Sequence, residues 1–186
     1  MAADDILLDV EERMEKAVSR LKSDLAGIRT GRANPGLVDS LKVTAYGSQM
    51  PMKQLGSISC PEPMQIVIRP FDPTTLKEIE KAIIASDLGF TPQNDGNFIR
   101  LNIPPMSAET RKKMVVRIRE MTEETKIALR NIRRDGMKMA EKGEKEKLFS
   151  ENDRDKLQEE IQDLIKKYEK DVDTMSKSRE ADVLED

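Results

Sequence analysis

One short run of this sequence is rich in residues that bind anions. The run LRNIRRDG, residues 129–136, brings Arg130, Arg133 and Arg134 together in a chain of 186 residues whose formal net charge is −3. The guanidinium group of arginine presents a planar fork of N–H donors that fits phosphate or carboxylate oxygens two at a time. These three arginines therefore either bind an anionic partner or pair with acidic side chains of the same protein.

The side chains that carry most enzymatic chemistry are missing. The sequence contains no histidine, which removes the commonest general base and the commonest metal ligand. Its single cysteine, Cys60, excludes an internal disulfide and a cysteine-cluster metal site. The run RTGR, residues 29–32, lacks the glycine spacing and the Lys-Ser/Thr pair of a phosphate-binding loop. We therefore expect no enzymatic activity, and no metal, cofactor or small-molecule substrate.

Composition and the first residues indicate a compartment. Charged residues make up 36% of the chain and aromatic residues 3%, a mix that is typical of long amphipathic helices. The acidic start MAADDILLDVEE is unlike a secretory signal or an Arg-rich transit peptide. No apolar run reaches the roughly 18–20 residues that a membrane helix needs. We expect a soluble, cytoplasmic, monomeric protein that does not contact a membrane.

Three long segments have the apolar period of amphipathic helices. The first, residues 6–29, carries the stripe Leu7, Val10, Met14, Ala17, Leu21, Leu25 and Ile28, with Gly31 as a left-handed C-cap. The second follows Ser107 as N-cap and carries Val115, Ile118, Thr122, Thr125, Leu129, Ile132, Gly136 and Met139. The third follows a capping box at Ser150 and Asp153 and carries Leu157, Ile161, Leu164, Tyr168, Val172 and Met175. Such stripes are buried most readily on one another, so the sequence predicts an elongated three-helix bundle.

Residues 31–105 have a different pattern and are expected to form an inserted domain. Short β-rich runs occur at residues 41–46, 57–60, 64–69 and 97–103, and a helix begins at Asp72 and Pro73 and closes near Gly89. The fold class is therefore α+β, with a small β/α/β domain inserted into a bundle that is built from residues 1–30 and 106–186. The two connections contain turn-forming residues and are expected to act as a two-stranded hinge at Gly31, Arg32, Gly36, Pro104 and Pro105.

Charge is distributed unevenly over the bundle. The formal net charge is −2 for residues 1–30, +5 for residues 106–148 and −6 for residues 149–186. At about 100° per residue, the basic residues of the middle helix fall within an arc of roughly 100° that runs for about 33 Å. The members of this basic arc are Lys112, Arg119, Lys126, Arg130, Arg133 and Arg134.

Two interpretations of the basic arc remain open on this pattern. The arc can pair with the acidic third helix, because charges beside an apolar seam often form interhelical ion pairs. It can also bind phosphates, and a straight row of this length suits duplex RNA, which proteins recognise by shape and backbone. No aromatic residues are interleaved with the arc, which argues against a platform for stacking single-stranded bases. Arg29 and Arg32 carry a similar ambiguity, since cations also stabilise the C-terminal end of a helix.

Several ordered motifs together resemble the bacterial ribosome recycling factor family. They are IRTGRANP at residues 28–35, PEPMQIVIRPFD at residues 61–72, AIIASDLGFTPQNDGNFIRLNIPP at residues 82–105 and ALRNIRRDG at residues 128–136. The resemblance implies a three-helix bundle with an inserted β/α/β domain, which agrees with the pattern above. It also implies that the protein enters the post-termination ribosome, binds large-subunit rRNA through the bundle and splits the subunits with the GTPase elongation factor G.

The resemblance also implies which residues contact rRNA. The RNIRR run matches the arginine cluster of the family's middle helix, so Arg130 and Arg133 are the first candidates. The remaining candidates for rRNA binding are Arg134, Arg111, Arg29, Arg32, Lys126 and Arg119. The C-terminal run SKSREADVLED is longer and more acidic than the tail expected for the family. Two other classes remain: a coiled-coil adaptor, which affinity for heparin or rRNA would exclude, and an enzyme housed in the insert, which the missing chemistry disfavours.

Overall fold

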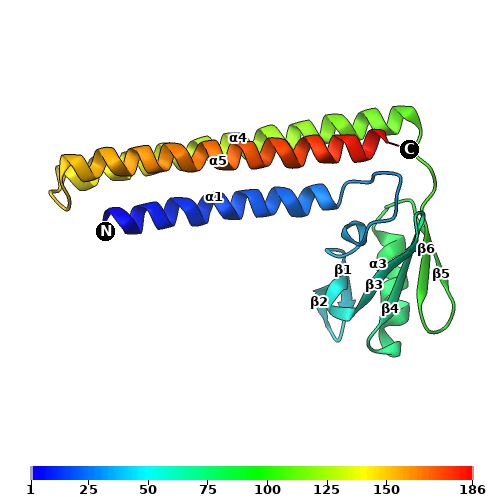
Figure 1. Cartoon of the computed structure of the whole chain (residues 1–186). Helices are drawn as coiled ribbons and strands as arrows, with labels where there is room; N and C mark the ends of the chain where they lie inside the picture. Colours follow the sequence, from blue (N-terminus) through cyan, green and yellow to red (C-terminus); the bar gives the residue numbers. More distant parts are fainter. Residues whose placement is uncertain (1, 186) are drawn as a thin grey trace. The chain divides into compact units, whose positions relative to one another are not determined.

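The computed structural model describes residues 2–185 (Figure 1). Packing divides this chain into two compact units, each built from separate parts of the sequence. We call residues 2–25 with 115–181 the helical unit, and residues 26–114 with 182–185 the sheet unit.

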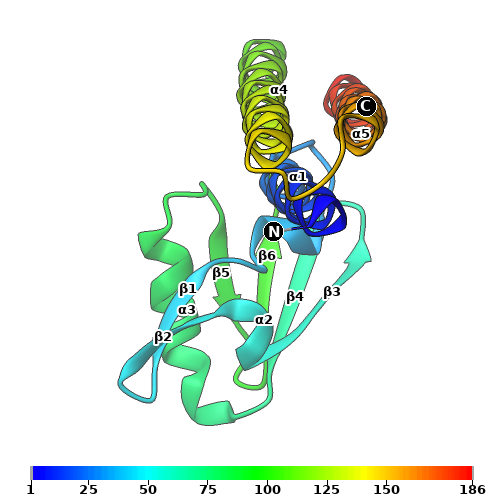
Figure 2. The same ribbon diagram turned by 90° about the vertical axis from the view of Figure 1, so that its left-hand side faces the viewer.

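Three long helices pack as a bundle, as the sequence predicts. They are α1 (Ala3–Ala26), α4 (Ala108–Lys145) and α5 (Glu151–Leu184), and Figure 2 shows them nearly end-on. Each helix buries one apolar stripe against the other two helices, because an isolated amphipathic helix would leave its apolar face in water. Among the most deeply buried side chains of the bundle are Val10, Met14, Ile118, Leu129, Leu157 and Ile161.

The apolar stripes differ from the predicted ones at several positions, where the neighbouring residue in sequence is buried instead. On α1, Ile6 is buried and Leu7 is only partly so. On α5, Ile165 and Ser176 are buried in place of the predicted Leu164 and Met175, which are half-buried. Steps of three and four residues both fit a helix, so the facing helices decide which neighbour turns inward.

Two of the predicted helix starts are confirmed by their hydrogen bonds. The hydroxyl of Ser107 accepts the Thr110 N–H at 3.2 Å, which caps α4. At the start of α5, the Ser150 hydroxyl accepts the Asp153 N–H at 3.2 Å, and the Asp153 carboxylate accepts the Ser150 N–H at 3.1 Å. This reciprocal pair is a capping box with an acid in the second position.

The end of α1 corrects the predicted one. The helix ends at Ala26 rather than Arg29, so Gly31 is not its C-cap, although Gly31 does adopt a left-handed backbone with φ +81°. Asn34 then begins a short 3₁₀ turn, η1 (Pro35–Leu37), by accepting the Gly36 N–H at 2.9 Å. The chain therefore leaves the helix before the glycine and the proline that we expected to end it.

The sheet unit has a four-stranded antiparallel sheet and a separate hairpin. The sheet order is β3 (Gly56–Glu62), β4 (Gln65–Pro70), β6 (Ile99–Asn102) and β5 (Thr91–Asn94). The hairpin pairs β1 (Lys42–Ala45) with β2 (Ser48–Pro51), and the short helix α2 (Met52–Leu55) follows it. The sequence did not predict β2, α2 or β5, whose runs SQMP, MKQL and TPQN have little β or helical signal of their own.

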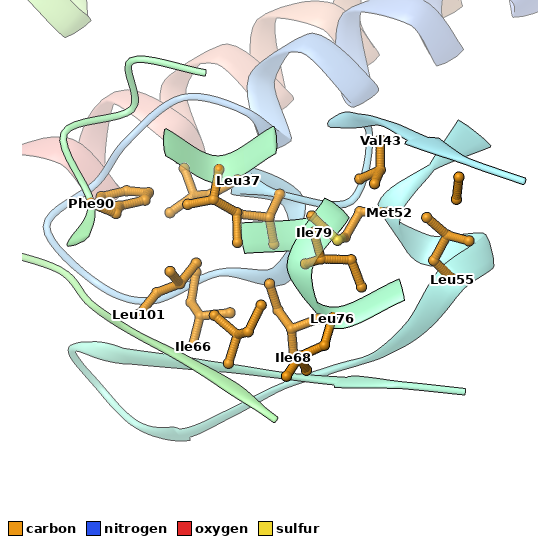
Figure 3. Close-up of a cluster of buried hydrophobic side chains, with 14 of the residues drawn as sticks. Leu37, Val43, Met52, Leu55, Ile66, Ile68, Leu76, Ile79, Phe90 and Leu101 are labelled. Atoms are coloured by element: carbon orange, nitrogen blue, oxygen red, sulfur yellow. The ribbon is translucent and has the colours of Figure 1, made fainter. Parts of the chain in front are cut away.

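The core of the sheet unit lies between the sheet, the hairpin and one helix (Figure 3). Helix α3 (Leu76–Ala85) follows a 3₁₀ turn, η2 (Pro73–Thr75), in which Asp72 accepts the Thr74 N–H at 2.9 Å. The predicted start at Asp72 and Pro73 is thus confirmed. The side chains that fill the core include Val43, Met52, Ile66, Ile68, Ile79 and Leu101.

Candidate nucleic-acid interface

Helix α5 supplies carboxylates to three members of the basic arc on α4. Arg119 donates from Nη2 to Glu180 at 3.0 Å, Lys126 Nζ lies 2.6 Å from Asp173, and Arg130 Nε donates to Glu169 at 3.3 Å. The steps of seven and four residues along α4 are matched by equal steps backwards along α5, because the two helices run antiparallel (Figure 1). These three cations are therefore ion-paired across the helix interface.

The arginines at the other end of the arc have no such partner. Arg133 donates from Nη1 to the neutral amide oxygen of Gln162 at 3.1 Å, and its Nε is buried without a hydrogen-bond partner in the described chain. Arg134 is exposed and makes no hydrogen bond or ion pair with any described residue. Positive charge in this part of α4 is thus uncompensated at Arg133 and Arg134.

The two interpretations of the arc therefore apply to different residues. Arg119, Lys126 and Arg130 form interhelical ion pairs, as the first interpretation expects. Arg119 and Arg130 nevertheless keep 69% and 50% of their side-chain surface exposed. The hydrogen bonds from Arg119 to Glu180 raise the pKa of Arg119 above its ordinary value, so this residue remains fully charged. Arg133 and Arg134 have no carboxylate partner among the described residues, so their charge is available to an external anion.

Three predicted contacts lie in the sheet unit. Arg29 donates to the Pro104 carbonyl oxygen and lies 5.7 Å above the ring of Phe90, and its partial burial lowers its pKa. Arg32 is exposed in the connecting segment, and Arg111 is half-buried in the first turn of α4. The guanidinium of Arg29 is therefore already engaged within the protein, whereas Arg133 and Arg134 are not engaged by a carboxylate.

The predicted hinge residues have distinct local structures. Gly31 has a backbone φ of +81°, which residues with a side chain rarely adopt. Gly36 has no positive φ, but the atoms packed around it leave no room for a side chain. A Cβ atom on Gly36 would lie 2.8 Å from the carbonyl oxygen of Ala26. Arg29 joins the two connecting segments through Pro104, the first residue of the Pro104–Pro105 pair.

Two residues that contact or flank the arginine run were not singled out from the sequence. Gln162 became visible only once the antiparallel register of α4 and α5 was known, because it stands seven residues before Glu169 on the same side of α5. Asp135 accepts from Arg13 at 2.8 Å and so ties α4 to α1 beside the arginine run. The three acids and the one amide of this row were present in the sequence, but the α4 residue that each of them faces was not known.

The described residues hold no cluster of His, Cys, Asp and Glu that could bind a metal ion. None of the helices in the described part of the chain is long and apolar enough to cross a membrane. The lone thiol of Cys60 has its pKa raised by partial burial, which does not favour a reactive thiolate.

Comparison with known proteins connects this geometry to a family. The family model described as ribosome recycling factor matches residues 21–184. The ribosome-recycling factor of Symbiobacterium thermophilum is 45% identical over 181 residues, which cover 97% of this chain and 98% of that protein. The chain belongs to the ribosome recycling factor family.

Other members of the family agree in sequence and fold. The ribosome-recycling factor of Rhodopirellula baltica is 66% identical over 140 residues, which cover 75% of each chain. A solution structure of the ribosome recycling factor is similar with a TM-score of 0.77 and 37% identity, covering 98% of this chain and 97% of the other. The family resemblance and the fold class inferred from the sequence are thus confirmed.

A second solved structure shows a family member in a complex. It contains the T. thermophilus ribosome recycling factor and the E. coli elongation factor G bound to the E. coli post-termination complex. This chain is similar to that factor with a TM-score of 0.70 and 37% identity over the full length of both chains. Members of the family are non-enzymatic factors of protein biosynthesis that act in ribosome recycling, so those inferences from the sequence are also confirmed.

Proposed function

We propose that this protein binds the post-termination ribosome and acts there with elongation factor G to split it into its subunits. Membership of the ribosome recycling factor family supports this proposal, as does the likeness to a factor bound with elongation factor G to a post-termination complex. The split releases the subunits for a new round of translation. GTP hydrolysis in this scheme belongs to the elongation factor, which fits a sequence without a phosphate-binding loop or histidine.

The helical unit supplies the main contact, to rRNA of the large subunit. The observation that carries this proposal is the uncompensated charge of Arg133 and Arg134 on a helix where Arg119, Lys126 and Arg130 are paired. Duplex RNA presents a regular row of phosphates, and a planar guanidinium can hold two phosphate oxygens at once. Arg130 lies beside this pair, and the outer contacts are Arg111, Arg29, Arg32, Lys126 and Arg119.

The inserted domain is proposed to reorient on the bundle. In this proposal residues 31–105 move as one body on the connections at Gly31, Arg32, Gly36, Pro104 and Pro105. The two glycines of the expected hinge differ in local structure: Gly31 has a left-handed backbone, whereas Gly36 packs against Ala26. Torsional change is therefore expected at Gly31 more than at Gly36. The protein acts in this proposal as a monomer in the cytoplasm, where its ribosomal partner is found.

Pelleting with ribosomes tests the proposed function directly. Vacant and post-termination ribosomes are sedimented with the protein over a series of salt concentrations, with and without elongation factor G and GTP. The proposal predicts co-sedimentation that weakens steeply with salt, because phosphate contacts release counterions. It also predicts subunit release only when protein, elongation factor G and GTP are all present. An absence of salt-sensitive co-sedimentation would contradict it.

A further inference from the structure

Three of the four α5 residues that face the basic arc are carboxylates and the fourth is a neutral amide, and this difference matters for anion binding. Glu180, Asp173 and Glu169 face Arg119, Lys126 and Arg130, with N–O distances of 3.0, 2.6 and 3.3 Å. Gln162 continues this row on the same side of α5 and faces Arg133. The row of four therefore offers three carboxylates and one amide.

The amide leaves the charge of Arg133 intact. A carboxylate next to a guanidinium cancels most of its field at a distance, whereas an amide oxygen fills one hydrogen-bonding site without adding charge. The neighbouring Arg134 has no partner in the described structure, so two adjacent cations stay available. Arg119, farther along the arc, is neutralised, since Glu180 holds it through both Nε and Nη2.

We propose that these four side chains of α5 select where α4 can bind RNA: Glu180, Asp173 and Glu169 restrain their cations, and Gln162 leaves Arg133 open. This inference rests on the proposed function and names a determinant of its specificity. A phosphate that approaches Arg119, Lys126 or Arg130 has to compete with a carboxylate that is already bound. A phosphate that approaches Arg133 displaces at most one bond to a neutral amide.

The consequence is selectivity among RNAs. An arbitrary polyanion lying along the arc finds three of its six cations, Arg119, Lys126 and Arg130, already paired with carboxylates of α5. An RNA surface that presents its phosphates to the Arg133–Arg134 end meets two uncompensated guanidinium groups. The acidic α5 thereby weakens binding to unrelated RNA more than binding to the ribosomal surface that fits this end.

Two substitutions change the row in opposite directions. Gln162→Glu adds a fourth carboxylate and is expected to weaken ribosome binding about two- to five-fold, the range of an exposed ion pair. Glu180→Gln frees Arg119 and is expected to strengthen binding to an unrelated RNA duplex of about 20 base pairs by a similar factor of about two to five. Because Arg119 then gains a phosphate, the salt dependence of duplex binding should steepen by about one phosphate unit.

Matched controls change charge elsewhere on α5. Ser178→Glu adds one negative charge and Asp171→Asn removes one, both at exposed positions on other sides of the helix. Each variant is measured with ribosomes and with the duplex, and its melting temperature is recorded. The proposal expects the row variants to change affinity by more than either control while the melting temperature changes little.

The outcomes separate this inference from the proposed function. If Gln162→Glu and Glu180→Gln bind like the wild-type protein while Arg133→Ala loses ribosome affinity, the row of α5 does not select RNA and this inference is wrong. If Arg133→Ala also keeps its affinity, the proposed rRNA contact is itself wrong. Equal effects of Gln162→Glu and Ser178→Glu would show that only net charge matters, and would likewise overturn the inference.

Discussion

Gly136 lies where α4 meets both of the other helices. A Cβ atom at this position would lie 2.7 Å from Val10 of α1 and 3.1 Å from Ile161 of α5. Gly136→Ala gains about 1 kcal/mol of helix propensity but is expected to lose about 1–3 kcal/mol to overpacking. We expect a net loss of unfolding free energy of up to about 2 kcal/mol, measured by urea denaturation.

Gly143 provides the matched control for this prediction. A Cβ atom there would lie 2.3 Å from the ring of Phe149, but Phe149 is half-buried and lies in the turn between α4 and α5, where its ring can move away. Gly143→Ala should therefore change the unfolding free energy less than Gly136→Ala does. Equal losses at both positions would show that a generic effect of removing a helical glycine is responsible.

Single residues show where the sequence was informative and where it was not. The arginine run was recognised from side-chain chemistry alone, and the structure divides its members by their partners. The choice between Ile6 and Leu7, or between Leu164 and Ile165, was not determined by the sequence, because both neighbours are apolar. The role of Gln162 depends on a register between two helices, which is a tertiary property.

At the scale of elements, the helix starts were predicted well because their hydrogen bonds are local. Ser107, Asp72 and the Ser150–Asp153 pair each bond a backbone N–H two or three residues away. The strands β2 and β5 were missed because their residues gain strand structure from pairing with β1 and β6 rather than from intrinsic preference. Pro92 in β5 suits its place at the edge of the sheet.

The capping box of α5 leads to a prediction about stability. Ser150→Ala removes the acceptor for the Asp153 N–H and should lower the unfolding free energy by about 1 kcal/mol. Thermal or urea unfolding measures this loss. Thr174→Ala is a suitable comparison, because its hydroxyl bonds a carbonyl within the helix and caps nothing. A loss at Ser150 no larger than that at Thr174 would contradict a capping role.

The capping box also predicts a dependence on pH. Hydrogen bonds from Ser150 hold the pKa of Asp153 below its ordinary value of 3.8. A carboxyl whose pKa is lower in the folded state stabilises the fold above its unfolded pKa, and this contribution disappears as the pH falls through the folded pKa. The difference in stability between wild type and Asp153→Asn should therefore shrink as the pH falls below about 4. A constant difference between about pH 7 and pH 2 would contradict this assignment.

At the scale of the whole molecule, the division into a helical unit and a sheet unit raises the question of motion. Spin labels are attached to Lys16→Cys and Lys81→Cys in a Cys60→Ser background. We expect the distance between the labels to be broadly distributed in free protein and narrowly distributed on the ribosome. The units are joined by two short connections, so changes in a few backbone torsions reorient one unit on the other. Replacing Gly31 by Ala should restrict this distribution more than replacing Pro105 by Ala, because φ +81° disfavours a side chain. One narrow distance in both states would contradict the hinge.

The family and fold class of this protein could be recognised from its sequence, because the sequence contains long family motifs and apolar residues at helical spacing. The placement of charge on the bundle could not, because it depends on which α5 residue faces each cation of α4. That placement is the reason for proposing Arg133 and Arg134 as the ribosomal contact.

The affinity of Arg133→Ala for ribosomes, measured beside its melting temperature, tests this contact most directly. Hydrogen bonds to a charged group contribute roughly 1.5–3 kcal/mol, so ribosome affinity should fall about ten- to a hundred-fold. Arg133→Lys keeps the charge without the planar fork and should recover part of this loss. The melting temperature should hardly change, because Arg133 bonds only a neutral amide among the described residues. A lowered melting temperature with ribosome affinity intact would contradict the proposed contact and make these arginines part of the packing of the bundle.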